Sequence, residues 1–196
     1  MKSLLKEASK HNNLIHISKK NIRILKWIAK YPVTHKGRRH LFQILQDILS
    51  RPACRVVDQG AAEGIICRLL QDRNYDVLAV DLEPEFRQCW NRLSVEGEIA
   101  DCSYNNWWDG KKFDIIIAGA WVACHGSEKK ITRDRRHTLE RIRDSWTEIL
   151  KDGGIVYFDV NVNKYPLNPL LKIFETKFEI KRFSKIPRHV FKCIKK

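Results

Sequence analysis

Residues 55–66 read RVVDQGAAEGII, and this stretch decides the fold. A short apolar run leads into a loop of small residues, and the loop opens a helical pattern. In a parallel sheet, this order of strand, loop and helix brings the backbone close to a ligand at the carboxyl end of the first strand. Gly60 permits a positive φ or a close approach, and Gly64 lets the helix pack tightly. The stretch therefore predicts a ligand-binding loop.

The rest of the chain after Pro52 alternates between apolar runs and helical patterns. The predicted strands are 54–57, 76–80, 98–100, 113–118 and 154–160, and the predicted helices are 63–73, 85–93 and 133–150. Continuously apolar strands alternating with helices are typical of a parallel sheet that is covered on both faces. Two further extended runs, 177–183 and 189–194, are too close together for a crossover helix and should pair antiparallel. The predicted fold class is α/β, with a doubly wound, mostly parallel seven-stranded sheet that has an antiparallel C-terminal strand.

The N-terminal part has a different pattern. Apolar residues recur at helical spacing between 13 and 31, with lysines and arginines between them, which predicts a basic amphipathic helix. A second helical pattern covers 41–49. We therefore divide the chain into a basic helical extension, 1–51, and a domain, 52–196. Docking of the amphipathic helix on a membrane surface is an alternative interpretation.

Charge is distributed unevenly along the 196 residues. The chain contains 37 Lys or Arg and 23 Asp or Glu, for a net charge of +14. Residues 1–51 contribute +10, residues 52–165 contribute −3, and residues 166–196 contribute +7. Basic ends around a slightly acidic middle predict an anionic partner, and nucleic acid, a membrane surface and acidic small molecules all fit. A solubilising surface is the alternative.

Compartment and broad class follow from what the sequence does not contain. Its six cysteines form no C-x-x-C pair, which argues against a zinc knuckle or a thioredoxin motif. No apolar signal region and no run long enough for a membrane span is present. We expect a reduced, cytoplasmic protein, with peripheral contact to the inner face of a membrane as a further option.

The chemistry of the loop favours a cationic ligand. A pyrophosphate site would have G-x-G-x-x-G, but Ala62 takes the place of a glycine here and Glu63 brings a negative charge. Asp58 and Glu63 frame the loop. Asp81 ends the second predicted strand about 20 residues beyond the glycines, where a carboxylate accepts both hydroxyls of a ribose. Asp101 ends the third strand beside the same crevice.

These segments resemble a known family. VVDQGAAEG, LAVDLEPE, EIADCS, FDIIIAG and LKDGGIVYFDV, in this order, are similar to motifs I to VI of the class I S-adenosylmethionine-dependent methyltransferases. The resemblance covers roughly residues 52–196, and Ala62 departs from the usual middle glycine of motif I. It implies S-adenosylmethionine as cofactor, S-adenosylhomocysteine as product, and a lid role for the N-terminal helix.

The resemblance also implies roles for individual residues. Asp58, Gly60, Ala61 and Gly64 would surround the methionine part of the cofactor. Asp81 would hold the ribose hydroxyls, Leu82 would pack on the adenine, and Asp101 with the backbone near Cys102 would bind the adenine edge. Gly119 would lie between cofactor and substrate.

The acceptor side is less well defined. The chain contains no Asn-Pro-Pro-Tyr tetrad and no Pro-Cys nucleophile, and Ala118-Gly119 replaces the acidic ligand of a metal-assisted site, so no metal is expected. The Lys-Asp-Lys-Glu tetrad of ribose 2′-O RNA methyltransferases is not matched either. His125 is the first candidate for a general base, because an unperturbed histidine is largely neutral near pH 7. Asp159 is the second, and a surface histidine and a capping aspartate are the plainer interpretations.

These observations lead to one preferred function and two alternatives. Trp108 and Trp121 are candidates for the wall of an acceptor pocket, and Lys19 and Arg38 for contacts with an anionic acceptor. We expect methylation of a hydroxyl on an anionic glycan, a lipid-linked sugar or a small acidic metabolite. The first alternative is an RNA methyltransferase that binds phosphates through its basic ends. The second is a catalytically silent binding module.

Overall fold

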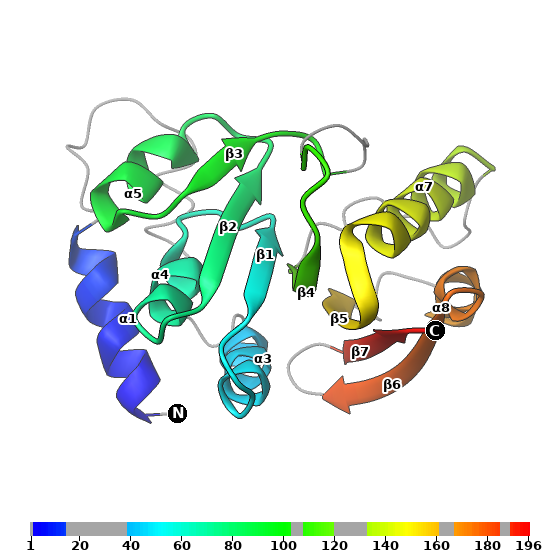
Figure 1. The fold of residues 1–196 in the computed structure, drawn as a ribbon, viewed down its shortest axis with the longest axis horizontal. Coiled ribbons are helices and arrows are strands. Elements are labelled where there is room, and N and C mark those ends of the chain that lie inside the picture. Colours follow the sequence, from blue (N-terminus) through cyan, green and yellow to red (C-terminus); the bar gives the residue numbers. More distant parts are fainter. Residues whose placement is uncertain (1, 15–38, 103–107, 120–132, 161–166, 185–188) are drawn as a thin grey trace.

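The computed structural model describes residues 2–14, 39–102, 108–119, 133–160, 167–184 and 189–196 (Figure 1). Its strands are β1 Arg55–Gln59, β2 Asp76–Asp81, β3 Gly97–Ile99, β4 Phe113–Ala118, β5 Leu150–Val160, β6 Phe178–Ser184 and β7 His189–Lys195. Its helices are α1 Lys2–Leu14, α3 Arg39–Leu49, α4 Ile65–Gln71, α5 Phe86–Leu93, α7 Arg133–Ile149 and α8 Leu167–Glu175.

All seven strands form one sheet in the order β3-β2-β1-β4-β5-β7-β6. β7 runs antiparallel to both of its neighbours, β5 and β6, and the other six strands run in one direction. The predicted fold class is confirmed, including the antiparallel pairing of the last two strands. The chain order reverses between β1 and β4, and ligands of open α/β sheets bind at such a switch point, outside the carboxyl ends of the strands.

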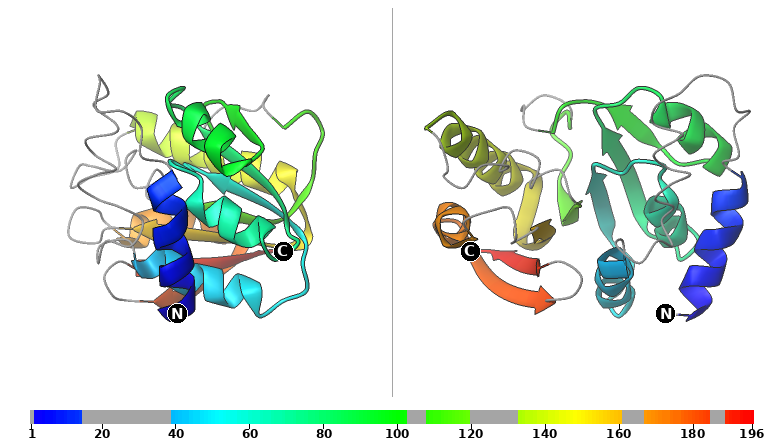
Figure 2. Two further views of the ribbon diagram at one scale, coloured as in Figure 1. Left: turned by 90° about the vertical axis from the view of Figure 1, so that its left-hand side faces the viewer. Right: turned by 180° about the vertical axis from the view of Figure 1, so that it is seen from behind.

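Helices cover both faces of the sheet (Figure 2). α3, α4 and α5 bury their apolar sides on one face, in a core that includes Phe42, Leu69 and Trp90. α7 and α8 cover the other face, where Trp146 packs between Phe158 and Phe174 with ring centroids 5.8 and 5.1 Å away. We refer to these as the α3/α4 face and the α7/α8 face.

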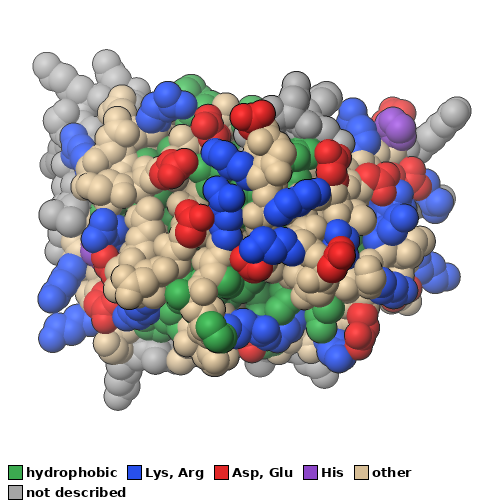
Figure 3. Space-filling view, in the orientation of Figure 1, with side chains coloured by type: hydrophobic (Ala, Val, Ile, Leu, Met, Phe, Trp, Pro, Cys, Tyr) green, Lys and Arg blue, Asp and Glu red, His purple; other side chains and the backbone are tan. Residues whose placement is uncertain are grey.

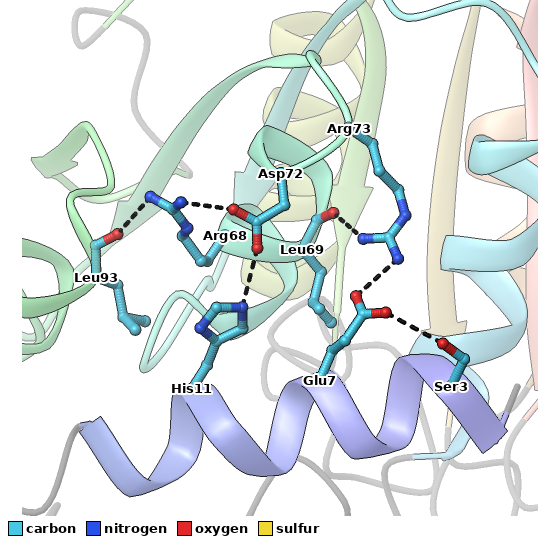
Figure 4. Close-up of polar contacts among 8 residues, drawn as sticks. All are labelled: Ser3, Glu7, His11, Arg68, Leu69, Asp72, Arg73 and Leu93. Carbon is cyan, nitrogen blue, oxygen red and sulfur yellow. Dashed lines mark hydrogen bonds and ion pairs between the residues drawn. The ribbon is translucent and has the colours of Figure 1, made fainter.

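The two N-terminal helices pack on the domain itself. Phe42, Leu45 and Ile48 of α3 are fully buried in the core of the α3/α4 face. α1 lies against α4 and α5 and buries Leu4 and Ala8. Polar contacts reinforce this docking (Figure 4): Arg73 donates to Glu7 at 2.7 Å, and His11 lies 3.0 Å from Asp72. The described part of 1–51 thus belongs to the layer that covers one sheet face. Most of the predicted 13–31 helix lies outside the described residues.

Several elements differ from the predictions. α1 and α8 were not predicted; α8 contains Pro169, which is tolerated because it falls in the first helical turn, where a backbone N–H needs no partner. α4 begins at Ile65 rather than Glu63, because Gly64 has a left-handed conformation. β5 begins at Leu150, four residues earlier than the predicted 154–160, directly after α7. Within the described ranges, no helix is both long and apolar enough to cross a bilayer.

Candidate cofactor-binding site

The loop after β1 is held against the end of β2 by its own backbone. The N–H groups of Gly60 and Ala61 both donate to the carbonyl of Val80, at 2.8 and 3.1 Å. Gly60 and Ala62 have positive φ values of 77° and 49°. A left-handed conformation costs a residue with a Cβ about 1 kcal/mol, which gives a physical reason for the glycine usual at this position. The loop therefore bends sharply at the carboxyl end of the switch-point strand.

Trp90 of α5 packs against this loop and holds it in place. Its Nε1 donates to the carbonyl of Ala62 at 2.8 Å. A Cβ added to Gly64 would lie 2.7 Å from Cδ1 of Trp90, and one added to Gly97 would lie 2.3 Å from Cε3. Both glycines are thus required by the indole ring that lies between them. Sequence reasoning missed Trp90, because a helical apolar position does not indicate which backbone it contacts.

Two buried carboxyl groups lie at the loop. Asp58, in β1, is 5% exposed, and Glu63 is fully buried. The Cys67 thiol of α4 donates to Asp58 at 3.5 Å. Burial, followed by the charge of Asp58, raises the pKa of Cys67 well above its ordinary value. This cluster gives the loop a negative character that suits a cationic ligand.

Asp81 joins the loop to the next strand end. Its Oδ2 accepts the N–H of Ala62 at 2.9 Å, and its Oδ1 accepts the N–H of Glu83 at 3.2 Å. Burial raises the pKa of Asp81, and the backbone N–H donors offset only part of that rise. Leu82, the next residue, is 60% exposed and is the one exposed large apolar side chain in the part of the chain that the structure describes. An exposed leucine beside a fixed carboxylate suits a flat, partly apolar ligand.

Cys102 lies where the predicted cofactor residues converge. It is 7% exposed, and burial is the main cause that raises the pKa of its thiol well above the ordinary value. The carboxylates of Asp81, Asp101 and Asp58 add to this rise, and the N–H of Gly60 opposes it. Residues from the carboxyl ends of β1 and β2 and from the loop after β3 thus lie close to one thiol.

The other side of the switch point contains Gly119 and Asp159. Gly119 follows β4, and a Cβ added to it would lie 3.4 Å from Cδ2 of Leu41 in α3. Asp159, near the end of β5, is fully buried, and its Oδ1 lies 3.7 Å from Nε2 of His40. The first turn of α3 therefore lies against the ends of β4 and β5. Neither His40 nor Leu41 was predicted as a site residue, because their contacts depend on how a distant helix docks.

The far end of α3 has a second polar anchor. Asp47 accepts a hydrogen bond from the Tyr157 hydroxyl and one from Lys192 at 2.8 Å. Burial raises the pKa of Tyr157, and the hydrogen bond to Asp47 raises it further. His40 and Asp47 thus fix both ends of α3 on β5 and β7.

The remaining predicted acceptor-side residues fall into two groups. Trp108 is 4% exposed and packs in the core of the α7/α8 face with Cys102 and Phe113, so little of its ring is left for an acceptor. His125, Trp121, Lys19 and Arg38 lie outside the described residues. Among the side chains that the structure describes, no three His, Cys, Asp or Glu lie close enough together to hold a metal ion.

Comparison with known proteins identifies the architecture. No family model matches the sequence. No curated protein matches it either. The N-methyltransferase NodS from Bradyrhizobium japonicum, solved with S-adenosylhomocysteine, is 12% identical with a TM-score of 0.66, over 96% of this chain and 97% of that chain. A TehB-like S-adenosylmethionine-dependent methyltransferase from Corynebacterium glutamicum is 17% identical with a TM-score of 0.62, over 80% of this chain and 87% of that chain.

This chain has the class I methyltransferase fold. Fibrillarin in a complex with Nop5p also matches, at 19% identity and a TM-score of 0.58, over 82% of each chain. The 16S rRNA methyltransferase RsmC from T. thermophilus, solved with AdoMet and guanosine, is 16% identical with a TM-score of 0.57, over 82% of this chain and 40% of that chain. The loop at 58–64 lies at the switch point between β1 and β4, and Asp81 and Asp101 lie at the ends of the neighbouring strands β2 and β3.

Proposed function

We propose that this protein is an S-adenosylmethionine-dependent methyltransferase. The observation that carries the proposal is the convergence of Asp58, Gly60, Asp81 and Cys102 at the carboxyl ends of β1 and β2 and the loop after β3. The fold of similar solved methyltransferases and the negative character of the loop support it. S-adenosylhomocysteine would be the product.

The residues of the crevice fit the cofactor. The carboxylate of Asp81 would accept the two ribose hydroxyls, and the exposed side chain of Leu82 would pack on the adenine. Asp101 and the backbone near Cys102 would bind the adenine edge, while the loop from Asp58 to Gly64 would hold the methionine part. The cofactor would supply a methyl group on a sulfonium that is already activated by its positive charge. Buried Asp58 and Glu63 would favour that charge, and the chain would align donor and acceptor.

For the acceptor, we propose an anionic molecule, methylated on a hydroxyl group: a glycan, a lipid-linked sugar or a small acidic metabolite. The described residues include 25 basic and 22 acidic side chains, and Figure 3 shows the two kinds interleaved on one face of the molecule. Segments 15–38, 103–107, 120–132, 161–166 and 185–188 contain the other 12 basic residues and one acidic residue, Glu128. Seven of these basic residues lie in 15–38, and three more, Lys129, Lys130 and Lys164, lie in the segments that follow β4 and β5. This charge supports an anionic acceptor.

RNA is the second candidate, and a separate observation favours it. The similar solved structures include a pre-rRNA processing fibrillarin from Methanococcus jannaschii and the 16S rRNA methyltransferase RsmC. If RNA is the acceptor, affinity should fall steeply with salt, and replacing Lys19 or Arg38 should weaken binding regardless of RNA sequence. Turnover that is insensitive to salt would argue against RNA.

Calorimetric titration with S-adenosylmethionine tests the core of the proposal. We expect the wild type to bind and Asp81→Asn to bind at least about tenfold more weakly, because one carboxylate oxygen that accepts a hydroxyl is lost. Asp76→Asn is the matched control: Asp76 begins the same strand and pairs with Arg55 at 3.0 Å, at the opposite edge of the sheet. Absence of binding by the wild type, or equal binding by Asp81→Asn, would overturn the cofactor assignment. Binding without transfer to any acceptor would instead indicate a silent module.

A further inference from the structure

The first turn of α3 contains a buried ionisable pair. His40 and Asp159 have side chains that are 3% and 0% exposed, with Nε2 of His40 3.7 Å from Oδ1 of Asp159. A carboxylate this deeply buried is costly unless a positive or hydrogen-bonding group compensates its charge. An imidazolium on His40 would supply such a group.

The pair lies beside the proposed cofactor crevice. Gln59, Ala118 and Phe158 are aligned across β1, β4 and β5, so the next residues along these strands are Gly60, Gly119 and Asp159. Neighbouring strands are about 4.8 Å apart, which places Asp159 about one strand spacing from Gly119 and about 10 Å from the loop. Leu41, next to His40, contacts the backbone position of Gly119. The pair is thus on the acceptor side of the switch point.

Two other carboxylates on this sheet face have partners of their own. Asp47, further along α3, is held by Tyr157 of β5 and Lys192 of β7. Asp58 and Glu63 lie at the cofactor loop, and Asp58 accepts a hydrogen bond from Cys67 of α4. Among the ionisable groups named in this paragraph and the previous ones, Asp159 is the one within ion-pair distance of His40.

We propose that His40 takes up the proton that the acceptor loses, and that the charge of the site thereby stays constant during methyl transfer. The inference rests on the proposed function. A bond forms between the acceptor atom and the methyl carbon, the carbon–sulfur bond breaks with its electron pair left on sulfur, and the acceptor proton moves to the imidazole. Before transfer, the sulfonium of the bound cofactor would supply the positive charge of the site. After transfer, the imidazolium of His40 would supply it. A constant charge avoids leaving an uncompensated carboxylate in a buried site.

This arrangement predicts a measurable proton linkage. Two unit charges about 10 Å apart, in an effective dielectric of about 20, change the proton affinity of one group by roughly tenfold. A cationic ligand should therefore expel part of the His40 proton, whereas its neutral product should not. A tenfold change in proton affinity corresponds to at most about half a proton per site, at a pH midway between the two titrations.

Calorimetry in buffers of different ionisation enthalpy tests the linkage without any acceptor. In a series of titrations across a range of pH, wild-type protein should release up to about half a proton more on binding S-adenosylmethionine than on binding S-adenosylhomocysteine, at the pH where the difference is greatest. The α-amino group of each ligand titrates with every variant, so only the part of the difference that His40→Gln removes counts. Asp47→Asn, at the other end of the same helix, is the matched control and should keep the wild-type difference.

The outcomes separate this inference from the proposed function. If both ligands bind and His40→Gln retains the wild-type difference, the role of His40 is overturned while the cofactor assignment stands. If neither ligand binds to wild type, both fall. Should His40→Gln fail to fold, the double variant His40→Gln/Asp159→Asn removes both charges together. NMR of the His40 ring in the wild type gives the same readout: more imidazolium is expected with S-adenosylhomocysteine than with S-adenosylmethionine, and equal protonation in both complexes overturns the inference.

Discussion

The two halves of the sheet differ in how far apart along the chain their contacting residues lie. In the cofactor half, formed by β1–β3 with α4 and α5, the hydrogen bonds from Ala62 to Asp81 and from Trp90 to Ala62 join residues 19 and 28 positions apart. In the acceptor half, formed by β4, β5 and β7 with α3, Asp47 bonds to Tyr157 and Lys192 across 110 and 145 positions. The loop of the cofactor half is held by contacts of short range, although α1 also docks on this half through Glu7 and Arg73. The acceptor half requires an N-terminal helix to dock on β5 and β7.

The largest effect should come from breaking the cofactor half at Gly64. Gly64→Ala adds a Cβ that would lie 2.7 Å from Trp90, at a residue with φ of 77°. We expect a loss of about 3 kcal/mol in unfolding free energy, from steric overlap and backbone strain together, measured by urea denaturation. Gly110→Ala is the control, because Gly110 has φ of 71° with nothing within 4 Å of an added Cβ, and it should cost only about 1 kcal/mol. Equal losses would show that the contact with Trp90 does not constrain the loop.

The second-largest effect should come from removing the charge of Asp47 in the acceptor half. Partial burial would raise the pKa of Asp47, but hydrogen bonds from Lys192 and Tyr157 outweigh it and hold the pKa below its ordinary value. A carboxyl group whose pKa is lowered by folding stabilises the protein above its unfolded pKa of about 3.9, and this contribution is lost as the pH falls through the folded pKa. Asp47→Asn should therefore cost about 2 kcal/mol at pH 7 and progressively less below about pH 4, by denaturant unfolding.

The same variant also tests whether the halves are separate. S-adenosylmethionine binding by Asp47→Asn should stay within about twofold of wild type, since Asp47 contacts only the acceptor half. A tenfold weaker affinity would show that the docking of α3 also shapes the cofactor crevice.

A smaller effect is expected from the indole N–H of Trp90. Trp90→Phe keeps most of the ring but leaves the carbonyl of Ala62 without its 2.8 Å donor, and it should cost about 1.5 kcal/mol and weaken cofactor binding. Trp146→Phe removes an equally short buried bond, to Gln59, on the α7/α8 face. Its loss of stability should be similar, with little change in cofactor affinity. Indistinguishable affinities in the two variants would contradict a supporting role for Trp90.

The smallest effect distinguishes two neighbouring alanines of the loop. Ala61 and Ala62 are both buried, but Ala62 has φ of 49° and Ala61 is not among the residues of positive φ. Glycine relieves strain at the first and only adds chain entropy at the second. Ala62→Gly should therefore be about 1 kcal/mol more stable than Ala61→Gly in thermal unfolding. A difference of the opposite sign would mean that the loop is not strained at Ala62.

The cofactor half could be predicted from sequence because its signals are local. An apolar strand, a loop with Gly60 and Gly64, and a carboxylate after each of the next two strands fall within about 45 consecutive residues, and their order fixes their place at one sheet edge. Trp90 was the gap. Its helix was predicted, but helical periodicity gives the buried side of a helix and not the glycines that the ring contacts.

In the acceptor half, local sequence patterns do not predict which residues contact one another. Asp159 was predicted from the end of a strand, yet its partner His40 follows a part of the chain with no motif at all. The helix that contains His40 was predicted as 41–49 and begins at Arg39, so the histidine fell just outside it. Trp108 was predicted to face an acceptor, and its burial reflects the large apolar area that a tryptophan gains in a core.

The burial of Cys102 among three carboxylates has a consequence for chemical labelling. Because thiolates are the species that react with alkylating reagents, a thiol whose pKa is raised by burial and by nearby negative charge is protected while the domain stays closed. Modification of Cys102 therefore follows the opening of the crevice rather than the intrinsic chemistry of the thiol. The rate at which Cys102 is labelled therefore measures how often this edge of the sheet opens, and a ligand bound there would lower that rate.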